Sequence, residues 1–396
     1  MGNDPDAVRP LAGYRVLDLT MVMSGPFCTR MLADLGAEVI KVEPPAGDQI
    51  RGRPPVRGDG HSTYFGQLNC GKRSIVLDLR HPDGAAVARR LATKCDVLVE
   101  NYRPGVAARL GLGYAALAVD NPGLVYCAIS GFGQTGPSAT RAAYAPIVHA
   151  ASGFDMATLG YQDDAERPAR TGTFLADVLG AVYAFGGIQT ALLHRERTGV
   201  GQFVDVALMD GMLSMLVYEV QEAQFPTRRR RPVYAPVRTT DGYVILAPVS
   251  QRLFEILADT VGHPEWRTDP RFVTIVEREQ HWDTLTAQIE GWTAQRSAAE
   301  CELVLTAAGL PCSRYRTVAE ALADPQVTHR SALGVVSDAA GTFLVPEQPF
   351  RFSATTVRAG PTVPDLGADG PDVLRGLLGL DDREIADLHA AGVLGR

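Results

Sequence analysis

Asp177 is the residue of this sequence best placed to do chemistry. It is the only acid between Arg170 and Arg195, in a segment that is otherwise apolar and contains several glycines. A carboxylate at the start of an apolar helix can cap the free backbone N–H groups of the first turn. It can also act as a nucleophile or base, because the same N–H groups support developing negative charge. This segment alone leaves both interpretations open.

Other common catalytic patterns are missing from the sequence. The histidines show neither HExxH nor i,i+4 spacing, and no GxSxG or GxxxxGK[ST] motif occurs. The six cysteines are widely scattered without a CxxC pair, which favours buried free thiols over a zinc site or a disulfide framework. We therefore expect no metal cofactor and a reducing, cytoplasmic location.

The segment GFGQTG at 131–136 matches the G-x-G-x-x-G pattern and follows a predicted strand. A dinucleotide fingerprint should open a helix in the first strand–helix unit. Here Pro137 and Pro146 flank a segment that forms helices poorly. We therefore expect no NAD.

Composition and charge limit the classes of partner. The chain has 396 residues, 46% of them hydrophobic, and a net charge of −7, which is typical of a globular protein and argues against a nucleic-acid-binding protein. The longest apolar run, 178–193, is short for a membrane span and contains Gln189 and Thr190. We expect neither nucleic acid nor a membrane as a partner.

The elements that must position Asp177 alternate between strands and helices. Apolar strands are predicted at 14–20, 37–43, 74–79, 96–101 and 124–130, with helices between them. This alternation predicts an α/β fold with a doubly wound sheet, whose ligands bind at the carboxyl ends of the strands. The loops at 20–25, 79–82, 100–105 and 131–137 are therefore candidate ligand loops.

Arginines gather on or near these loops and could hold phosphate groups by charge-assisted hydrogen bonds. Each could equally be an ordinary surface residue. The set is Arg80, Arg103 and Arg109 after the strands, with Arg51, Arg53 and Arg57 in the long loop at 44–66.

Changes in composition predict three parts: a large α/β domain at 1–225, a smaller α+β domain at 226–330, and an extended, proline-rich segment at 331–396 that returns to the large domain. The run Arg228–Arg231 lies at the first boundary. It is a solvated linker or an interaction patch, and we favour the linker.

Several ordered motifs resemble the family III CoA-transferases, the group that includes formyl-CoA transferase, carnitine CoA-transferase and α-methylacyl-CoA racemase. They span nearly the whole chain and include SGPFCTRMLADLGAEVIKVEPP, NCGKRSIVLDLR, DVLVENYRPGVAARLGL, GFGQTGP and RTGVGQFVDVALMDG. The resemblance implies a Rossmann-like large domain, a small domain and an interlocked homodimer. It also implies a CoA-transferase that moves CoA from an acyl-CoA to a carboxylic acid.

The family's functional residues can be placed on this sequence. The resemblance implies that Asp177 is the catalytic aspartate, which forms an anhydride and then a thioester, and that Tyr144 is the aromatic residue beside the reacting group. It implies contacts with coenzyme A at Val22, Met23, Ser24, Leu77, Arg80, Asn101, Tyr102, Arg109 and Leu110.

The sequence also departs from the family pattern. Met23 replaces a glutamine, Ala145 replaces an acid of formyl-CoA transferase, and the glycine-rich lid before the small-domain strands is absent. Formate and oxalate are therefore not carried over as substrates. An α-methylacyl-CoA racemase is the alternative; it needs a histidine where this chain has Tyr144, and His149 could in principle substitute. A non-catalytic CoA-binding protein is the minor alternative.

Overall fold

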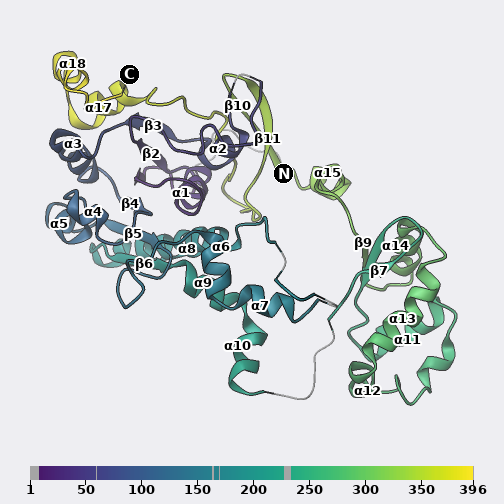
Figure 1. Cartoon of the computed structure of the whole chain (residues 1–396). Coiled ribbons are helices and arrows are strands. Elements are labelled where there is room, and N and C mark those ends of the chain that lie inside the picture. Colours follow the sequence, from purple (N-terminus) through teal and green to yellow (C-terminus); the bar gives the residue numbers. More distant parts are fainter. Residues whose placement is uncertain (1–8, 59, 163–164, 169, 227–232, 396) are drawn as a thin grey trace. The chain divides into compact units, whose positions relative to one another are not determined.

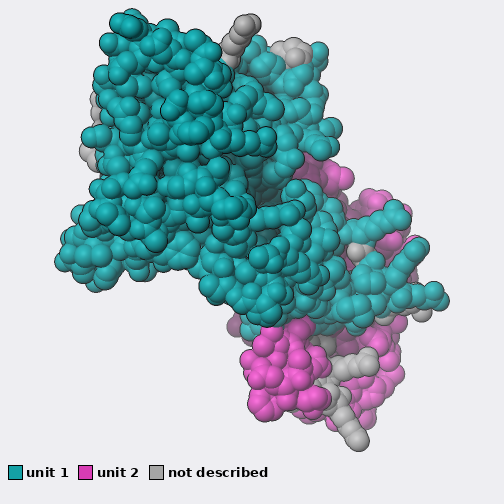
Figure 2. All heavy atoms as spheres, turned by 60° about the vertical axis from the view of Figure 1, so that its left-hand side comes forward, with its two compact units in different colours: residues 1–217, 328–396 teal, residues 218–327 magenta. Residues whose placement is uncertain are grey.

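The computed structural model describes residues 9–58, 60–162, 165–168, 170–226 and 233–395. The chain forms two compact units, Met1–Val217 with Thr328–Arg396, and Tyr218–Val327, which are coloured separately in Figure 2. The boundaries predicted from composition were at 225 and 330. The run Arg228–Arg231 lies outside the described residues.

The first unit is built around a sheet of six parallel strands, in the order β3-β2-β1-β4-β5-β6 (Figure 1). The strands are β1 (Arg15–Asp18), β2 (Glu38–Glu43), β3 (Arg73–Val76), β4 (Val97–Glu100), β5 (Val125–Ser130) and β6 (Phe203–Ala207). The strand order changes direction between β1 and β4, and such a point leaves a crevice at the carboxyl ends of the strands. The predicted α/β class with a parallel sheet is confirmed.

Helices cover both faces of this sheet. One face packs against α1 (Ser24–Asp34) and α8 (Leu175–Thr198), and the other against α3 (Pro82–Ala92), α5 (Tyr114–Asp120), α17 (Gly370–Leu378) and α18 (Asp382–Ala390). In β5, Val125 and Cys127 face α1 and α8, whereas Tyr126 and Ala128 lie in the other core. Both sets are buried, which explains why the strands are apolar without alternation.

Helix α8 is the central helix of the first unit. It is long and apolar enough to cross a membrane by length and composition, with 44% of its most apolar window buried. It is longer than the apolar run at 178–193. Its buried residues, including Ala181, Ala184 and Ile188, belong to the core beneath the sheet. This is the position of a core helix.

Shorter helices complete the first unit: α2 (Thr63–Asn69), α4 (Val106–Arg109), α6 (Ala145–Ala151), α7 (Phe154–Leu159) and α9 (Leu208–Met215). Helices α6 and α7 were not predicted. Pro146 falls in the first turn of α6, where its missing N–H costs no helical hydrogen bond. The returning segment adds the hairpin of β10 (Leu333–Asp338) and β11 (Gly341–Pro346), predicted only as extended chain.

The second unit has its own core and its own sheet. Antiparallel strands β7 (Val237–Arg238), β8 (Tyr243–Leu246) and β9 (Cys312–Arg314) pair in that order. Phe254, Trp266 and Leu285 are among its buried residues. Its helices are α11 (Gln251–Thr260), η1 (Pro264–Arg267), α12 (Ile275–Gln280), α13 (Trp282–Thr293), α14 (Ala298–Ala307), α15 (Val318–Leu322) and α16 (Pro325–His329), while α10 (Val217–Gln224) begins at the boundary.

Candidate active site

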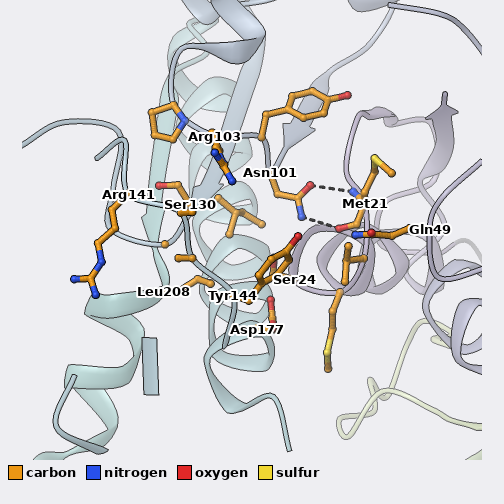
Figure 3. A pocket seen from close by; sticks show the side chains of 18 residues that line it. Met21, Ser24, Gln49, Asn101, Arg103, Ser130, Arg141, Tyr144, Asp177 and Leu208 are labelled. Carbon is orange, nitrogen blue, oxygen red and sulfur yellow. Dashed lines mark hydrogen bonds between the residues drawn. The ribbon is translucent and has the colours of Figure 1, made fainter. Parts of the chain in front are cut away.

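A pocket in the first unit opens at the crevice between the ends of β1 and β4 (Figure 3). Its walls come from the turn after β1, the loop after β4, the end of β5, the loop before α6 and the first turn of α8. Eight residues predicted from the sequence line it together: Val22, Met23, Ser24, Asn101, Tyr102, Arg103, Tyr144 and Asp177.

Asp177 is held in the first turn of α8, but it is not the cap of that helix. The N-cap is Phe174, which makes no side-chain capping bond. Asp177 instead lines the pocket together with Ser24. Burial raises the pKa of Asp177 to about 6, and the nearby hydroxyl and backbone N–H of Ser24 lower it in part. A carboxylate of this kind is ionised at neutral pH and poorly solvated, as a nucleophile should be.

His149 supplies the acceptor that the start of α8 needs. Its Nε2 atom accepts the backbone N–H of Ala176 at 3.1 Å, and its side chain is buried. Burial lowers the pKa of His149, which keeps the ring neutral. Its Nε2 atom is therefore occupied by the hydrogen bond to the backbone of α8. His149 does not line the pocket. The histidine that the racemase alternative would need as a base therefore has a structural role at the start of α8.

The turn after β1 is anchored from two sides. The side chain of Asn101 donates to the Met21 carbonyl at 2.8 Å and accepts the Met21 N–H at 2.9 Å, as the dashed lines in Figure 3 show. Below the turn, Lys72 contacts Asp18 at 2.9 Å in a fully buried ion pair. Gly25 follows the turn, and a Cβ there would lie 2.3 Å from Thr20. Only glycine allows this close approach.

Two tyrosines flank Asp177. Tyr144 lines the pocket and is 65% exposed, and Figure 3 shows its ring beside Ser24 and Asp177. Burial raises the pKa of Tyr64 to about 12, and the charges of Asp177 and Asp48 add to that effect. Tyr64 therefore stays a neutral hydroxyl at physiological pH.

The other predicted contact positions lie outside the pocket lining. Leu77 is fully buried in the core, and Leu110 packs partly against the same core. Arg80 follows β3 and Arg109 ends α4; both side chains are exposed.

The arginines predicted as a phosphate-binding set have different environments. Arg51 binds Glu43 at 2.7 Å and Arg57 pairs with Asp338, so carboxylates already hold these two. Arg53 is exposed. Arg103 lines the pocket.

Several pocket residues were missed in the sequence. Gln49 and Arg141 come from irregular loops, where the sequence carries no periodic signal. Leu208 begins α9, and its position in the pocket depends on packing. Ser130 ends β5, a position that the rule of carboxyl ends could have identified. Its buried hydroxyl has no hydrogen-bond partner.

The GFGQTG segment and the residues that follow it up to Tyr144 form bends, turns and irregular chain. The segment therefore does not begin a helix. All six cysteines are free. Among the residues that the structure describes, no group of three or more His, Cys, Asp or Glu side chains could hold a metal ion. The pocket therefore offers a partly buried carboxylate, hydrogen-bond donors, tyrosines and arginines as its chemistry.

Comparisons with known proteins agree with this chemistry. The profile described as CoA-transferase family III matches residues 11–370. The chain is 36% identical to a succinyl-CoA--D-citramalate CoA-transferase of Chloroflexus aurantiacus, over 98% of each chain. It is 42% identical to an acetyl-CoA:oxalate CoA-transferase of Acetobacter aceti, over 87% of this chain and 89% of the relative.

Solved structures agree as well. A CAIB/BAIF family protein from Brucella suis is 33% identical and superposes with a TM-score of 0.81, covering 93% of this chain and 99% of the other. Rv3272 from Mycobacterium tuberculosis is 30% identical with a TM-score of 0.84, covering 92% and 99%. The chain is an enzyme, and it belongs to CoA-transferase family III.

Proposed function

We propose that this enzyme moves CoA from an acyl-CoA thioester to a dicarboxylic acid, with Asp177 as the covalent carrier. The observation that carries the proposal is the environment of Asp177. Its carboxylate lies in a pocket at the switch point of the sheet, where Ser24 lines the same wall and lowers its pKa. Its pKa of about 6 leaves it mostly ionised at neutral pH.

The transfer takes four steps. The Asp177 carboxylate attacks the thioester carbonyl, the C–S bond breaks, and a mixed anhydride and CoA thiolate form. The thiolate attacks the Asp177 carbonyl of the anhydride, which releases the donor acid and leaves an aspartyl-CoA thioester. The acceptor carboxylate attacks this thioester, the C–S bond breaks, and a second anhydride and CoA thiolate form. The thiolate then attacks the acceptor carbonyl, which gives the new acyl-CoA and restores Asp177.

Ser24 has a role in each step at the Asp177 carbonyl. Attack by thiolate or carboxylate places negative charge on an Asp177 oxygen, and the Ser24 hydroxyl and N–H, which lower the pKa of that carboxyl group, would donate to it. Preorganised donors of this kind lower barriers by roughly 3–4 kcal/mol each in other enzymes. The amino end of α8 adds a favourable dipole.

A dicarboxylic acceptor fits the charge of the pocket. Arg103 and Arg141 line the same pocket as Asp177. While one carboxylate reacts, the second needs a cation, and a guanidinium can bind a carboxylate with two hydrogen bonds. The acids in the names of the two relatives described above, citramalate and oxalate, are dicarboxylic acids.

The remaining parts of the proposal concern CoA and assembly. Arg80 and Arg109 would bind CoA phosphates along the carboxyl edge of the sheet. We also infer a Rossmann-like large domain, a homodimer and a cytoplasmic location. Exposed apolar residues on α8, Val182, Tyr183 and Leu193, support an interface between copies.

The test combines trapping and exchange. The enzyme is incubated with succinyl-CoA and hydroxylamine, and peptide mass spectrometry should locate a hydroxamate on Asp177. Asp177→Ala should give no adduct and no CoA exchange while remaining folded. A fully active Asp177→Ala variant would refute the carrier role. Glutarate should accept CoA better than butyrate, and equal rates for the two acids would refute the dicarboxylate preference.

A further inference from the structure

Val22 has a backbone conformation that a valine rarely adopts. It lies in the turn between β1 and α1 with φ of 68°, in the left-handed region. A β-branched residue there is a genuine outlier, because its Cβ crowds the neighbouring backbone. Such a conformation persists only where the surroundings impose it.

The side chain that imposes it is Asp48. Its carboxylate accepts the Val22 N–H, with N–O distances of 3.2 and 3.3 Å. Asp48 is 2% exposed, and Lys41 donates to it at 3.1 Å. The same Lys41 ammonium donates to the Thr20 carbonyl at 2.8 Å. The buried Lys41–Asp48 ion pair therefore binds the turn at two points, the Thr20 carbonyl through Lys41 and the Val22 N–H through Asp48.

The turn leads directly to Ser24, which lines the pocket together with Asp177. Met23 is the N-cap of α1 and Ser24 its first residue. The position of the Ser24 N–H and hydroxyl thus depends on the backbone angles of Val22, two residues earlier. Asn101 fixes Met21 on the strand side of the turn. The backbone angles of Val22 therefore set how the fixed residue Met21 is connected to helix α1.

We propose that Asp48 is a positioning residue, which holds Val22 in the left-handed conformation and thereby keeps Ser24 in the pocket wall beside Asp177. Asp48 does not line the pocket, so it acts through the turn. The proposal rests on the proposed role of Asp177 as the carrier.

The direction of the effect follows from the groups around Asp177. The Ser24 hydroxyl and N–H lower the pKa of Asp177, so moving them away raises that pKa. Tyr64 interacts with Asp177 electrostatically, and Tyr144, Arg103 and Arg141 line the same pocket. Burial raises the pKa of Tyr64 to about 12, so this hydroxyl stays neutral in the range where Asp177 titrates.

The test compares Asp48→Ala, Asp48→Asn, Val22→Gly and the double variant of Val22→Gly with Asp48→Ala. The activity readout is the pH profile of succinyl-CoA:glutarate exchange. A second readout needs no turnover: the pH dependence with which a carbodiimide and an amine label Asp177, read by peptide mass spectrometry. Asp34→Asn is the matched control, because Asp34 is a buried carboxylate bound to Arg30 and Gln348 outside the pocket.

Asp48→Ala should lower kcat about tenfold and move the acid limb and the labelling midpoint up by about one pH unit, the effect of losing one bond to a charged group. Asp48→Asn keeps an oxygen acceptor for Val22 and should retain most activity. Glycine adopts positive φ without strain. In the Val22→Gly background, Asp48→Ala should therefore cause a much smaller loss of kcat and a smaller shift of the labelling midpoint. Asp34→Asn should leave both pH profiles in place.

Two results would overturn the proposal. One is an Asp48→Ala substitution that lowers kcat equally with valine or glycine at position 22, because Asp48 would then not act through this turn. The other is an Asp48→Asn variant as impaired as Asp48→Ala, which would assign the effect to the charge facing Lys41. If Asp177 is not the carrier, the Asp177→Ala variant stays active, yet the labelling midpoint still tests the positioning role. The two failures are therefore distinct.

Discussion

Asp177→Asn should make the enzyme more stable at neutral pH while abolishing CoA transfer. The pKa of Asp177 is about 6 in the fold and 3.8 for a free side chain. At about 1.36 kcal/mol per pH unit, this difference corresponds to roughly 3 kcal/mol of destabilisation once the carboxylate is ionised. The dipole of α8 favours the charged form by only about 0.5 kcal/mol, which is too little to reverse the sign. Asparagine has the same shape and no charge.

The pH dependence gives this prediction its sign. Between pH 4 and 6 the folded protein keeps a proton on Asp177 that the unfolded chain has released, so raising the pH through this window favours unfolding. The wild type and Asp177→Asn should therefore have the same stability near pH 4. They should differ by roughly 3 kcal/mol at pH 7, a gap on the order of 5 °C in Tm for a unit of this size.

The assay is thermal melting of both proteins in steps from pH 4 to pH 8, with Asp120→Asn as the control. Asp120 is an exposed acid at the end of α5 that pairs with Arg89 at 2.8 Å, and a surface pair of this kind contributes little. A variant Asp177→Asn that is less stable than wild type at every pH would refute the reasoning, because Asp177 would then be a structural residue of α8. A constant gap across pH would refute the buried-charge explanation.

The remaining predictions concern the charged residues around the pocket. Arg80→Ala and Arg109→Ala should each weaken CoA binding, with a smaller loss at high salt because exposed charges are screened; calorimetric titration with CoA at 50 and 500 mM NaCl measures this, and unchanged affinity removes that arginine from the site. Lys72→Met should destabilise the enzyme by about 3–5 kcal/mol, because it leaves Asp18 buried without its ammonium partner. Urea unfolding at pH 7 checks this value, and a loss below 1 kcal/mol would mean that Lys41 alone compensates Asp18.

Much of the sheet was predictable because parallel strands buried on both faces produce continuous apolar runs. The runs around β1, β2, β4 and β5 identify these strands, and the rule that ligands bind at carboxyl ends directs attention to Val22, Asn101 and their neighbours. These residues do meet in one pocket with Asp177. The alternation of helices and strands was therefore enough to predict where the site lies on the sheet.

The missed parts depend on contacts between distant segments. Helix α6 was hidden by Pro146, whose favourable first-turn position is visible only when the helix start is known. His149 supplies an acceptor to Ala176, 27 positions away, and no local pattern encodes such a pair. Gln49 and Arg141 reach the pocket from loops without periodicity. Their places follow from the packing of the whole unit.

Asp18 and Asp177, the two aspartates near the turn after β1, have opposite electrostatic environments. Burial alone would raise the pKa of both. Lys72, Lys41 and the hydroxyls of Thr20 and Thr29 reverse this for Asp18 and lower its pKa to about 2. For Asp177 the hydroxyl and N–H of Ser24 offset burial only in part, and its pKa stays near 6.

This difference matters for chemistry as well as for stability. A carboxylate stabilised by two ammonium groups is a weak nucleophile, because attack would draw its charge away from those cations. In the proposed transfer, Asp177 would lose little by sharing its charge with an acyl group, and the Ser24 hydroxyl and N–H would be available to the oxyanion that follows. Lys41 and Lys72 lie beneath the turn, where they bind its backbone and Asp18. Lys41 and Lys72 do not line the pocket that holds Asp177, which is the arrangement that the proposed carrier role requires.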